Sequence, residues 1–466
     1  MDLTLRTDPL PALGNGFSVV LVERVLRQAQ VLEVSPQWSQ LPLGHPSGRV
    51  TAFRPEQRLT AVVATLAAGL KGIGPANTYL RPNSAVAAWL GRPFPDQGTM
   101  HRWLQQTNDA QAAALRRHLH QVVRQHGRFW QELWSNRLLV VDVDGQGLVA
   151  RGQRFEKAAT GWLGEGIDRG YQRYVCYAGA TQEVLDEFLA AGNQTLMSQF
   201  PVLLAGLDEV IPSAYRRRVV LRGDSHLGTI GNLRACRAHG YHYLCPLQSW
   251  SAAKRLREHV QQHGCRGGWF TEEDSKGQEH RVQFWIVRRW QLCGKGKSRK
   301  LSTQATVYCE HLPAGKKEWS VLVSDRKRDK GRRLWRAYHE RGGTIEEYND
   351  QAERAYHLEI MRTISFAGLN ALHSLIGLCW NLTHWAGEHL ALPPLQAPQA
   401  ERARWQPAAA MDLAEVMARA AQSGLRLYRA RAGAVLEVED TAGTPESSAW
   451  RWWLQEPIQL LLPLTG

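Results

Sequence analysis

Acidic residues at three separate places in the sequence could act together in one chemical site. Asp144 follows the apolar run 138–143, Asp224 follows the run 219–221, and Glu346 lies in a later stretch of helical character. Carboxylates are the ligands that Mg²⁺ prefers, and two such ions about 4 Å apart can activate a nucleophile and stabilise a leaving oxygen in phosphoryl transfer. If the three acids converge, they predict a site for two Mg²⁺ ions, or Mn²⁺ in their place, that cleaves phosphodiesters.

Each acid has an alternative to weigh. Asp142 shares a strand face with Asp144 because the two lie two residues apart, and Glu347 adjoins Glu346. We favour Asp144 because it lies at the strand end beside Gly145, where backbone can approach a metal ion. Taken singly, a strand-end aspartate is usually a turn or cap residue, and a helical glutamate is usually a solvated charge. Only the combination of three acids indicates a site.

The acids need a sheet and a helix to bring them together. Residues 15–135 have helical apolar spacing, but from residue 137 short apolar runs typical of buried strands alternate with helical patterns. Strands are expected at 138–143, 171–178, 219–221 and 241–247, and helices at 98–119, 181–191, 193–204 and 228–239. The alternation predicts an α/β fold, in which sites lie at the carboxyl ends of strands.

The pattern divides the chain into three regions. Residues 1–135 form a predicted all-α N-terminal domain, the candidate reader of a DNA sequence. Residues 136–390 form the predicted catalytic domain, with a β-rich insertion at about 249–320 flanking a Gly/Lys/Arg loop. A proline-rich linker then leads into a small C-terminal region, 391–466, where a pair of short strands is expected between 425 and 438.

An excess of basic residues points to a polyanionic partner. Lys and Arg number 57 against 43 Asp and Glu, which gives a net charge of +14 and an isoelectric point near 9.6. Because the basic clusters adjoin the proposed acids, we expect double-stranded DNA as the partner and phosphate contact as their role. The candidates are Arg288, Arg289, Lys295, Lys297, Arg299, Lys300, Arg326, Lys327, Arg328 and Lys330, followed by the run 216–218 and by Arg81, Arg102, Arg116 and Arg117.

The sequence argues against several other classes of protein. The seven cysteines are odd in number and form no Cys-x-x-Cys pair, so neither a disulfide framework nor a zinc ribbon is expected. The N-terminus lacks the pattern of a signal peptide. The most apolar stretch, 364–378, contains Asn370 and His373 and is expected to be a buried helix, not a membrane span. We therefore expect a cytoplasmic protein without a membrane partner.

Several segments together resemble the DDE transposases of bacterial insertion sequences, whose catalytic domain has an RNase H-like fold. Residues 140–145 resemble the first-aspartate strand of that family. Residues 221–225 resemble its second-aspartate motif, and a Gly-Tyr-x-Tyr strand follows at 240–243 as in the family. Residues 334–346 are similar to the segment that enters the family's glutamate helix. The resemblance covers roughly residues 15–385.

The family's glutamate signature is matched only in part. Tyr338 and Arg341 have the family's spacing, and the resemblance makes both of them DNA contacts. Glu346 falls one residue later than the family pattern has it, and Glu353 stands where the family has a lysine. Arg354 is a candidate substitute for that lysine in contacting phosphate.

The resemblance implies a DNA transposase that hydrolyses a phosphodiester at each element end and joins the freed 3′-hydroxyl to target DNA. It also implies a homodimer on DNA, associated with the bacterial nucleoid. Gln146 stands where the family commonly has Ser or Thr, and the lysine is missing. An inactive or repurposed DNA-binding relative is therefore an alternative, as is a nuclease of the same fold.

Three tryptophans, Trp285, Trp290 and Trp319, lie in or beside the expected insertion. In similar transposases such an insertion can stack on an extruded terminal base, and aromatic rings provide the stacking. The alternative is that these tryptophans fill the small core of the insertion. We expect at least two of the three to do so.

Overall fold

The computed structural model describes most of the chain between residues 53 and 390, with three short segments near the ends. The described residues are 6–12, 53, 55–82, 93–164, 166–273, 279–293, 300–311, 316–326, 331–390, 425–430 and 436–440. The end segments form a three-stranded sheet of β1 (Arg6–Ala12), β12 (Leu425–Ala430) and β13 (Leu436–Asp440). The expected pair of short strands between 425 and 438 is confirmed as β12 and β13.

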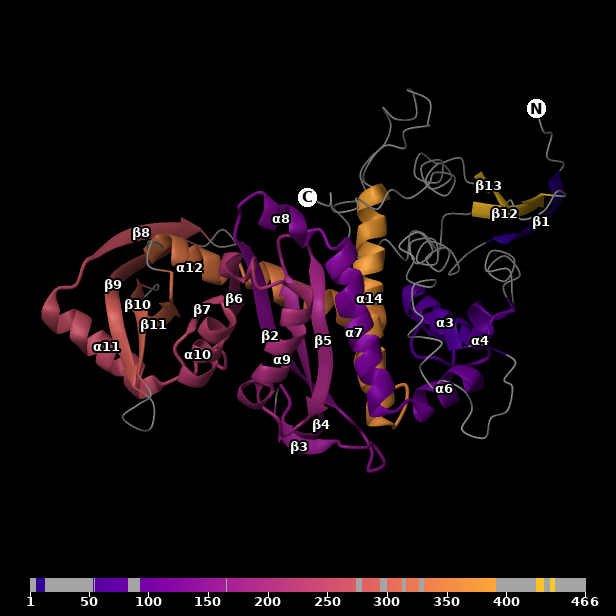
Figure 1. Ribbon diagram of the computed structural model, residues 1–466, viewed down its shortest axis with the longest axis horizontal. Helices are drawn as coiled ribbons and strands as arrows, with labels where there is room; N and C mark the ends of the chain where they lie inside the picture. The colour runs from indigo at the N-terminus through magenta and orange to yellow at the C-terminus, as the bar shows by residue number, and fades with distance from the viewer. Residues whose placement is uncertain are drawn as a thin grey trace, which may run out of the picture.

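A ten-stranded mixed sheet forms the frame of the protein (Figure 1). Its central strands β2 (Leu139–Val149), β6 (Val219–Gly223) and β7 (His242–Pro246) run parallel. All three are rich in buried apolar residues, as expected for strands covered on both faces. Because they are parallel, their carboxyl ends meet at one edge of the sheet. The mixed α/β architecture predicted from the sequence is confirmed.

Antiparallel strands extend the sheet beyond β2. The long strand β4 (Ile167–Ala178) pairs with β2, and both β3 (Ala159–Trp162) and β5 (Glu183–Ala191) pair with β4. The prediction of a helix at 181–191 is wrong, because this stretch is strand β5. Its apolar residues recur at nearly helical intervals, but eight of its nine residues are buried, acids included. The local pattern favours a helix, but pairing with β4 and the internal hydrogen bonds and ion pairs of the acids stabilise a strand instead.

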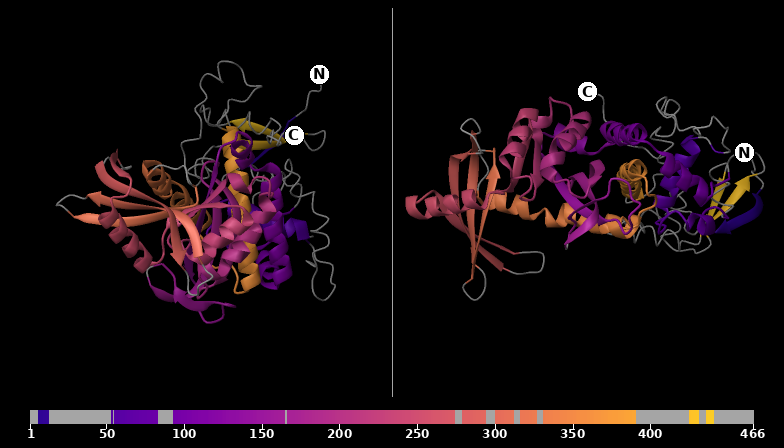
Figure 2. Two further views of the ribbon diagram at one scale, coloured as in Figure 1. Left: turned by 60° about the vertical axis from the view of Figure 1, so that its left-hand side comes forward. Right: turned by 90° about the horizontal axis from the view of Figure 1, so that it is seen from below.

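The predicted insertion continues the same sheet. Strand β11 (Lys317–Ser324) pairs antiparallel with β7, and β10 (Lys300–His311), β9 (Glu279–Cys293) and β8 (Gly267–Glu273) follow in order. Helix α11 (Trp250–His263) contacts β9, β10 and β11. These strands lie at the end of the molecule opposite α3, α4 and α6 (Figures 1 and 2).

Helices cover the sheet, with α14 (Phe366–Leu390) packed against β5 and against α7 (Asp109–His126). The expected helix at 98–119 is two helices, because Asn108 caps α7 and its side chain accepts from the backbone N–H of Gln111. Further helices, which precede β7 in the chain, are α3 (Pro55–Ala67), α4 (Ala76–Tyr79), α6 (Gln97–Gln106), α8 (Phe129–Trp134), α9 (Leu196–Val210) and α10 (Ile230–His239).

The buried helix expected at 364–378 is confirmed as part of α14. Its side chains bind the sheet directly: Asn381 exchanges two hydrogen bonds with the backbone of Val184, and Asn370 Oδ1 accepts from Leu189 N. In the part of the chain that the structure describes, no helix combines the length and the apolarity needed to cross a bilayer.

The glutamate segment is built from two helices joined by a wider turn. Helix α12 (Gly331–His339) is followed by η3 (Gly342–Glu346), a π-helical turn, and then by α13 (Glu347–Tyr356). η3 contacts strand β2. A π turn holds one more residue than an α turn, so the segment can absorb an extra residue without losing its direction.

Candidate active site

The register of the central strands brings the two aspartates side by side. Val143 of β2 pairs with Gly223 of β6, so Asp144 and Asp224 are the next residues along two adjacent parallel strands. Both are partly exposed where the pairing of β2 with β6 ends. Asp144 does not end its strand, as the sequence predicted, because β2 continues to Val149 paired with β4. One oxygen of Asp224 accepts from the backbone N–H of His226 at 2.8 Å, which fixes the turn that follows β6.

Asp142 lies on the same strand as Asp144 but in a different environment. It is fully buried, and Arg222 holds it in a bidentate ion pair with N–O distances of 2.5 and 2.7 Å. Thr344 Oγ1 contacts the same carboxylate at 2.7 Å. Because its charge is already neutralised and shielded from solvent, Asp142 is occupied in tying β2 to β6 and to η3.

The π turn η3 places Glu346 near Asp144, and Arg341 connects the two side chains. Arg341 donates to Asp144 Oδ1 at 2.6 Å and to Glu346 Oε1 at 3.0 Å. A spacing of five residues fits one turn of a π-helix, so Arg341 and Glu346 lie on one face although they would diverge in an α-helix. Thus the extra residue before Glu346 is taken up by η3. Glu347 is exposed and instead accepts from Gln351 on α13 at 3.0 Å.

The electrostatics of Asp144 show that three acids share this space. Burial raises the pKa of Asp144, the guanidinium of Arg341 opposes that rise, and the charges of Asp224 and Glu346 add to it. Burial lowers the pKa of Arg341, but the charges of Asp144, Asp142 and Glu346 outweigh this effect and raise it. Among the described residues, Arg341 is the only cation that forms an ion pair with Asp144, Asp224 or Glu346, and it does so with Asp144 and Glu346. The site therefore carries more negative charge than it neutralises.

The donor set suits a hard divalent cation, because it consists of carboxylate oxygens in a partly buried place with surplus negative charge. No three acidic, histidine or cysteine side chains of the described residues already lie close enough to hold one metal ion. Arg341 lies between Asp144 and Glu346, and its guanidinium accounts for the distance between these two carboxylates. A metal ion would compete with this guanidinium for the same oxygens.

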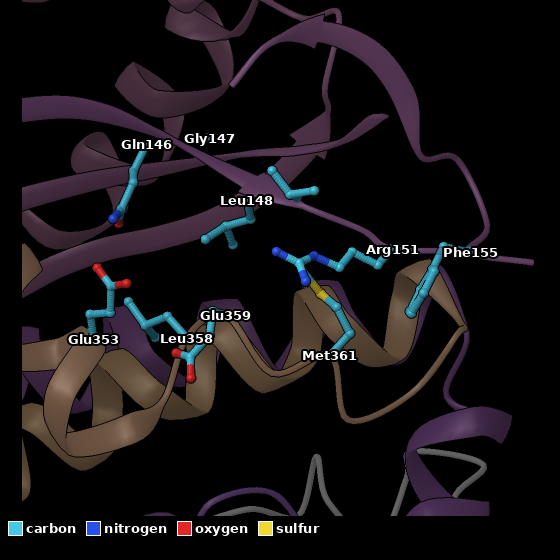
Figure 3. A pocket seen from close by; sticks show the side chains of 10 residues that line it. Gln146, Gly147, Leu148, Arg151, Phe155, Glu353, Leu358, Glu359 and Met361 are labelled. Carbon is cyan, nitrogen blue, oxygen red and sulfur yellow. The ribbon is translucent and has the colours of Figure 1, made fainter. Parts of the chain in front are cut away.

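A cavity of about 560 Å³ lies between the second half of β2, from Gln146 on, and the chain from Glu353 to Met361 (Figure 3). Glu353, at the position where the family resemblance expects a lysine, lines this cavity. Arg151 lines it as well and points into it from the far side. Arg354 is exposed and donates to the backbone carbonyl of Asp350 at 3.4 Å. Leu148 and Leu358 provide a buried apolar floor.

Some predicted DNA contacts lie in or beside the inserted strands. Arg288 and Arg289 are exposed on β9 at a bulge, where the register with β10 shifts and Arg289 adopts a left-handed φ of 58°. Lys300 begins β10 and is exposed, whereas Arg326 follows β11 and is half-buried. Tyr338 is partly buried on α12. Outside the described residues lie Lys295, Lys297, Arg299, Lys327, Arg328 and Lys330.

Other arginines turn out to serve the fold. The run Arg216–Arg218 precedes β6, so it lies at the opposite end of that strand from Asp224, and the prediction that it adjoins the acids is wrong. Arg216 pairs with Asp208 at 3.0 Å. Arg116 is bound to the buried Asp186 at 2.5 and 2.7 Å and is likewise not a phosphate contact.

The three tryptophans pack inside the inserted region. Trp285 and Trp319 are stacked, with ring centroids 5.7 Å apart and planes 10° from parallel. The ring centroids of Trp290 and of His259 on α11 lie 5.3 Å apart. The guanidinium of Arg257, on the same helix, lies over the ring of Trp319. All three are partly buried against the main core. The expectation that at least two of them fill the core of the insertion agrees with this packing.

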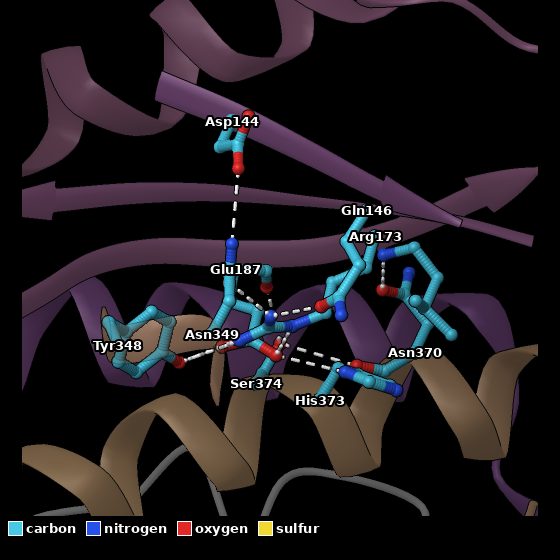
Figure 4. A network of polar contacts seen from close by, with 10 residues as sticks. Asp144, Gln146, Arg173, Glu187, Tyr348, Asn349, Asn370, His373 and Ser374 are labelled. Carbon is cyan, nitrogen blue, oxygen red and sulfur yellow. Dashed lines mark hydrogen bonds and ion pairs between the residues drawn. The ribbon is translucent and has the colours of Figure 1, made fainter. Parts of the chain in front are cut away.

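The sequence reasoning missed Arg173 and Asn349, which link Asp144 to the interior of the protein (Figure 4). It also missed Arg222 as the partner of Asp142. The spacing offered one signal for Asn349, because it follows Glu346 by three residues and so lies on the same side of the helix. Nothing in the local sequence marks Arg173, which sits in a strand next to a tyrosine.

A mixed sheet with two aspartates at the point where the parallel pairing of β2 and β6 ends, accompanied by a glutamate from a helix, defines an α/β protein with a carboxylate site. Comparison with protein families makes this specific. Residues 36–385 match the family described as Transposase DDE domain group 1, and the chain belongs to that family. The resemblance to DDE transposases that the sequence predicted is confirmed; an origin in a bacterial insertion sequence stays a prediction.

No curated protein matches the chain. Among solved structures, the chain is similar to the piggyBac transposase in its synaptic complex with hairpin DNA, with 11% sequence identity and a TM-score of 0.40. The match covers 90% of this chain and 82% of that one.

Proposed function

We propose that this protein is a metal-dependent DNA transposase that cuts element ends and joins them to target DNA. Asp144, Asp224 and Glu346 are the proposed catalytic acids and metal ligands. The observation that carries this proposal is the register of β2 and β6, which sets two aspartates side by side, with Glu346 tied to the same place through Arg341. Membership of a DDE transposase family supplies the reaction class.

The residues present fit this chemistry. Two Mg²⁺ or Mn²⁺ ions, when bound, would lower the pKa of a water and stabilise the charge that develops on phosphate. Asp144 and Asp224 would hold them from the sheet, and Glu346 from the helix. Arg341, released from the carboxylates, would be free to contact a DNA phosphate, in the role that the family resemblance gives it. The alternates Asp142 and Glu347 are disfavoured, the first by its ion pair and the second by its orientation.

Double-stranded DNA is the proposed partner. Exposed Arg288, Arg289 and Lys300 lie on the inserted strands, which continue the sheet past β7. Arg151 points into the cavity that Glu353 also lines, and it could supply the phosphate-binding cation that position 353 lacks. The sheet, with antiparallel strands on one side of β2 and parallel ones on the other, supports an RNase H-like description of residues 136–390. By analogy, two copies would bring two ends together.

The test is metal-dependent cleavage and joining of DNA that carries the ends of the element. We expect Asp224→Asn and Glu346→Gln to reduce Mg²⁺-dependent cleavage to the level of DNA without protein, while DNA binding persists. Glu347→Gln is the matched control, because this neighbour points away from the acids, and it should cleave like the wild type. Full cleavage by Asp224→Asn would contradict the assignment.

The same assay separates the alternatives. A nuclease of the same fold would cut the ends but would not join them to a second duplex. An inactive DNA-binding relative would bind DNA in a salt-sensitive way and cut nothing in Mg²⁺ or Mn²⁺.

A further inference from the structure

A chain of hydrogen bonds joins the proposed catalytic strand to the helix that carries Glu346 (Figure 4). Asn349 of α13 donates to Asp144 Oδ2 at 3.1 Å. Its side-chain oxygen accepts from Arg173 Nη1 at 2.8 Å, which fixes which end of the amide faces the aspartate. Only 9% of Asn349 is exposed. The amide is therefore held in one orientation between a buried cation and a partly exposed acid.

Arg173 is a rigid anchor for this amide. It is fully buried on β4, and each of its five N–H groups has a partner. Nε and Nη2 bond Glu187 at 2.8 and 3.2 Å, and Nη2 also donates to Tyr348 Oη at 2.8 Å. Nη1 donates to Asn349 and, at 3.0 Å, to Gln146. A saturated guanidinium has no alternative orientation available, so it holds its acceptors in place.

The same anchor sets the position of α13 on the sheet. Tyr348 and Asn349 lie two and three residues after Glu346, and both bind Arg173. Gln146, which departs from the family's usual Ser or Thr, lies two residues after Asp144 on β2 and binds it too. Arg173 thus connects the strand of one acid to the helix of another.

Asn349 differs from Arg222 in the charge that it brings. Arg222 neutralises Asp142 in a bidentate pair. Asn349 orients Asp144 with a neutral N–H, so that the negative charge of the carboxylate stays available to a cation. We infer that Asn349 is a positioning residue, which orients the Asp144 carboxylate and holds it at the correct separation from Glu346 for metal binding. This inference rests on the proposed function of the acids.

The test compares Mn²⁺ binding, followed by electron paramagnetic resonance, in the wild type and in Asn349→Ala. Loss of a group that orients a metal ligand commonly weakens metal affinity by about 10- to 100-fold. We expect a loss at the lower end of this range. The Mg²⁺ concentration that half-saturates DNA cleavage should rise in parallel, with a smaller change in the rate at saturating Mg²⁺.

A matched control separates positioning from stability. Asn370→Ala also removes a side-chain amide that binds the sheet, since Asn370 accepts from Leu189 N at 2.9 Å, but this residue does not contact the acids. It should lower the melting temperature and leave Mn²⁺ affinity unchanged. Asn349→Ser is the second variant in case the alanine variant does not fold, because its short hydroxyl group cannot span Arg173 and Asp144.

Wild-type Mn²⁺ affinity in folded Asn349→Ala or Asn349→Ser would overturn the positioning role while leaving the proposed function intact. If the wild type itself bound no Mn²⁺, or bound it equally well after Asp144→Asn, both proposals would fail. Weaker binding in the Asn349 variants but not in Asn370→Ala would support the inference.

Discussion

Two groups of acids in this protein have the same side chains and opposite surroundings. The acids of β5, which are Glu183, Asp186 and Glu187, are fully buried, and each has its own internal partners. Asp144, Asp224 and Glu346 are all at least partly exposed, and the only ion pairs that they form among the described residues are those of Asp144 and Glu346 with Arg341. Internal partners satisfy the carboxylates of the first group, whereas the second group keeps negative charge that a bound cation can neutralise.

The partners of the β5 acids explain why burial is tolerated. Asp186 binds Arg116 and His120, and Glu187 binds Arg173 and His373. Glu183 accepts hydrogen bonds from the backbone of residues 128 and 129 and from the side chains of Thr181 and Trp385. Buried charges are stable only when paired and hydrogen-bonded in this way.

The contrast teaches how to tell a structural acid from a functional one. Although burial acts the other way, Arg173 and His373 lower the pKa of Glu187 to about 2. At the edge of the sheet, burial and the neighbouring acids raise the pKa of Asp144 in spite of Arg341. The direction of the pKa shift alone does not divide the two groups, because burial also raises the pKa of Glu183 in spite of its four hydrogen-bond donors. The difference lies in the neighbours: the charges of other acids act on Asp144, whereas each acid of β5 has internal partners of its own.

The largest expected effect concerns stability. Glu187→Gln breaks a buried ion pair and leaves Arg173 without its counter-charge, which typically costs about 3–5 kcal/mol. Glu346→Gln removes a charge from a side chain that is 59% exposed, and its effect should stay within about 0.5 kcal/mol. Urea denaturation of both variants measures the difference. Similar losses of unfolding free energy in the two variants would show that the groups are not distinct.

The stability of the protein at low pH should depend on Glu187 and Asp144 in opposite ways. The pKa of Glu187 is depressed, so its stabilising contribution is present above its ordinary value of 4.5 and is lost as the pH falls towards about 2. Asp144 has a raised pKa, so its contribution is present below its ordinary value of 3.8 and is lost as the pH rises. Between pH 4.5 and 2, Glu187→Gln should therefore lose less stability than the wild type, whereas Asp144→Asn should lose at least as much. Unfolding free energies measured across this range test the prediction, which the opposite ranking would contradict.

The smallest effect concerns competition at the acid site. Because Arg341 occupies oxygens of Asp144 and Glu346, Arg341→Gln should bind Mn²⁺ about tenfold more tightly, or about 1.4 kcal/mol, although its affinity for DNA should fall. Mn²⁺ titration measures the first change and a salt-controlled DNA binding assay the second. Arg354→Gln, an exposed change on α13, should leave Mn²⁺ affinity as it is. Weaker Mn²⁺ binding in Arg341→Gln would mean that the arginine supports the metal site instead of competing with it.

Much of the sheet could be predicted from the sequence because its strands are short apolar runs bounded by turn residues. This holds for β6 and β7 and for the first half of β2. The prediction that Asp144 ends its strand is wrong, because β2 continues to Val149 in its pairing with β4. Prediction also fails for β5, whose acids looked like the polar face of a helix because their partners come from distant residues. Arg116, for example, is 70 residues away from Asp186.

The candidate site was predictable to a similar degree. Residue type and strand position were enough to propose Asp144 and Asp224 as neighbours. They were not enough to exclude Asp142, because the ion pair with Arg222 joins two strands that are 80 residues apart in sequence. The late position of Glu346 looked like a mismatch, since no local sequence signal announces that a turn is π-helical.

The sequence by itself determined which acids follow apolar runs and that the protein as a whole is basic, because these properties depend on local order and composition. Only the tertiary structure decided which acids are neutralised and which keep free charge. The physical reason is that the charge state of a buried carboxylate depends on cations and N–H groups within a few ångströms, and here those groups come from other strands and helices. Asp142 and Asp144, two residues apart on one strand, received opposite surroundings in this way.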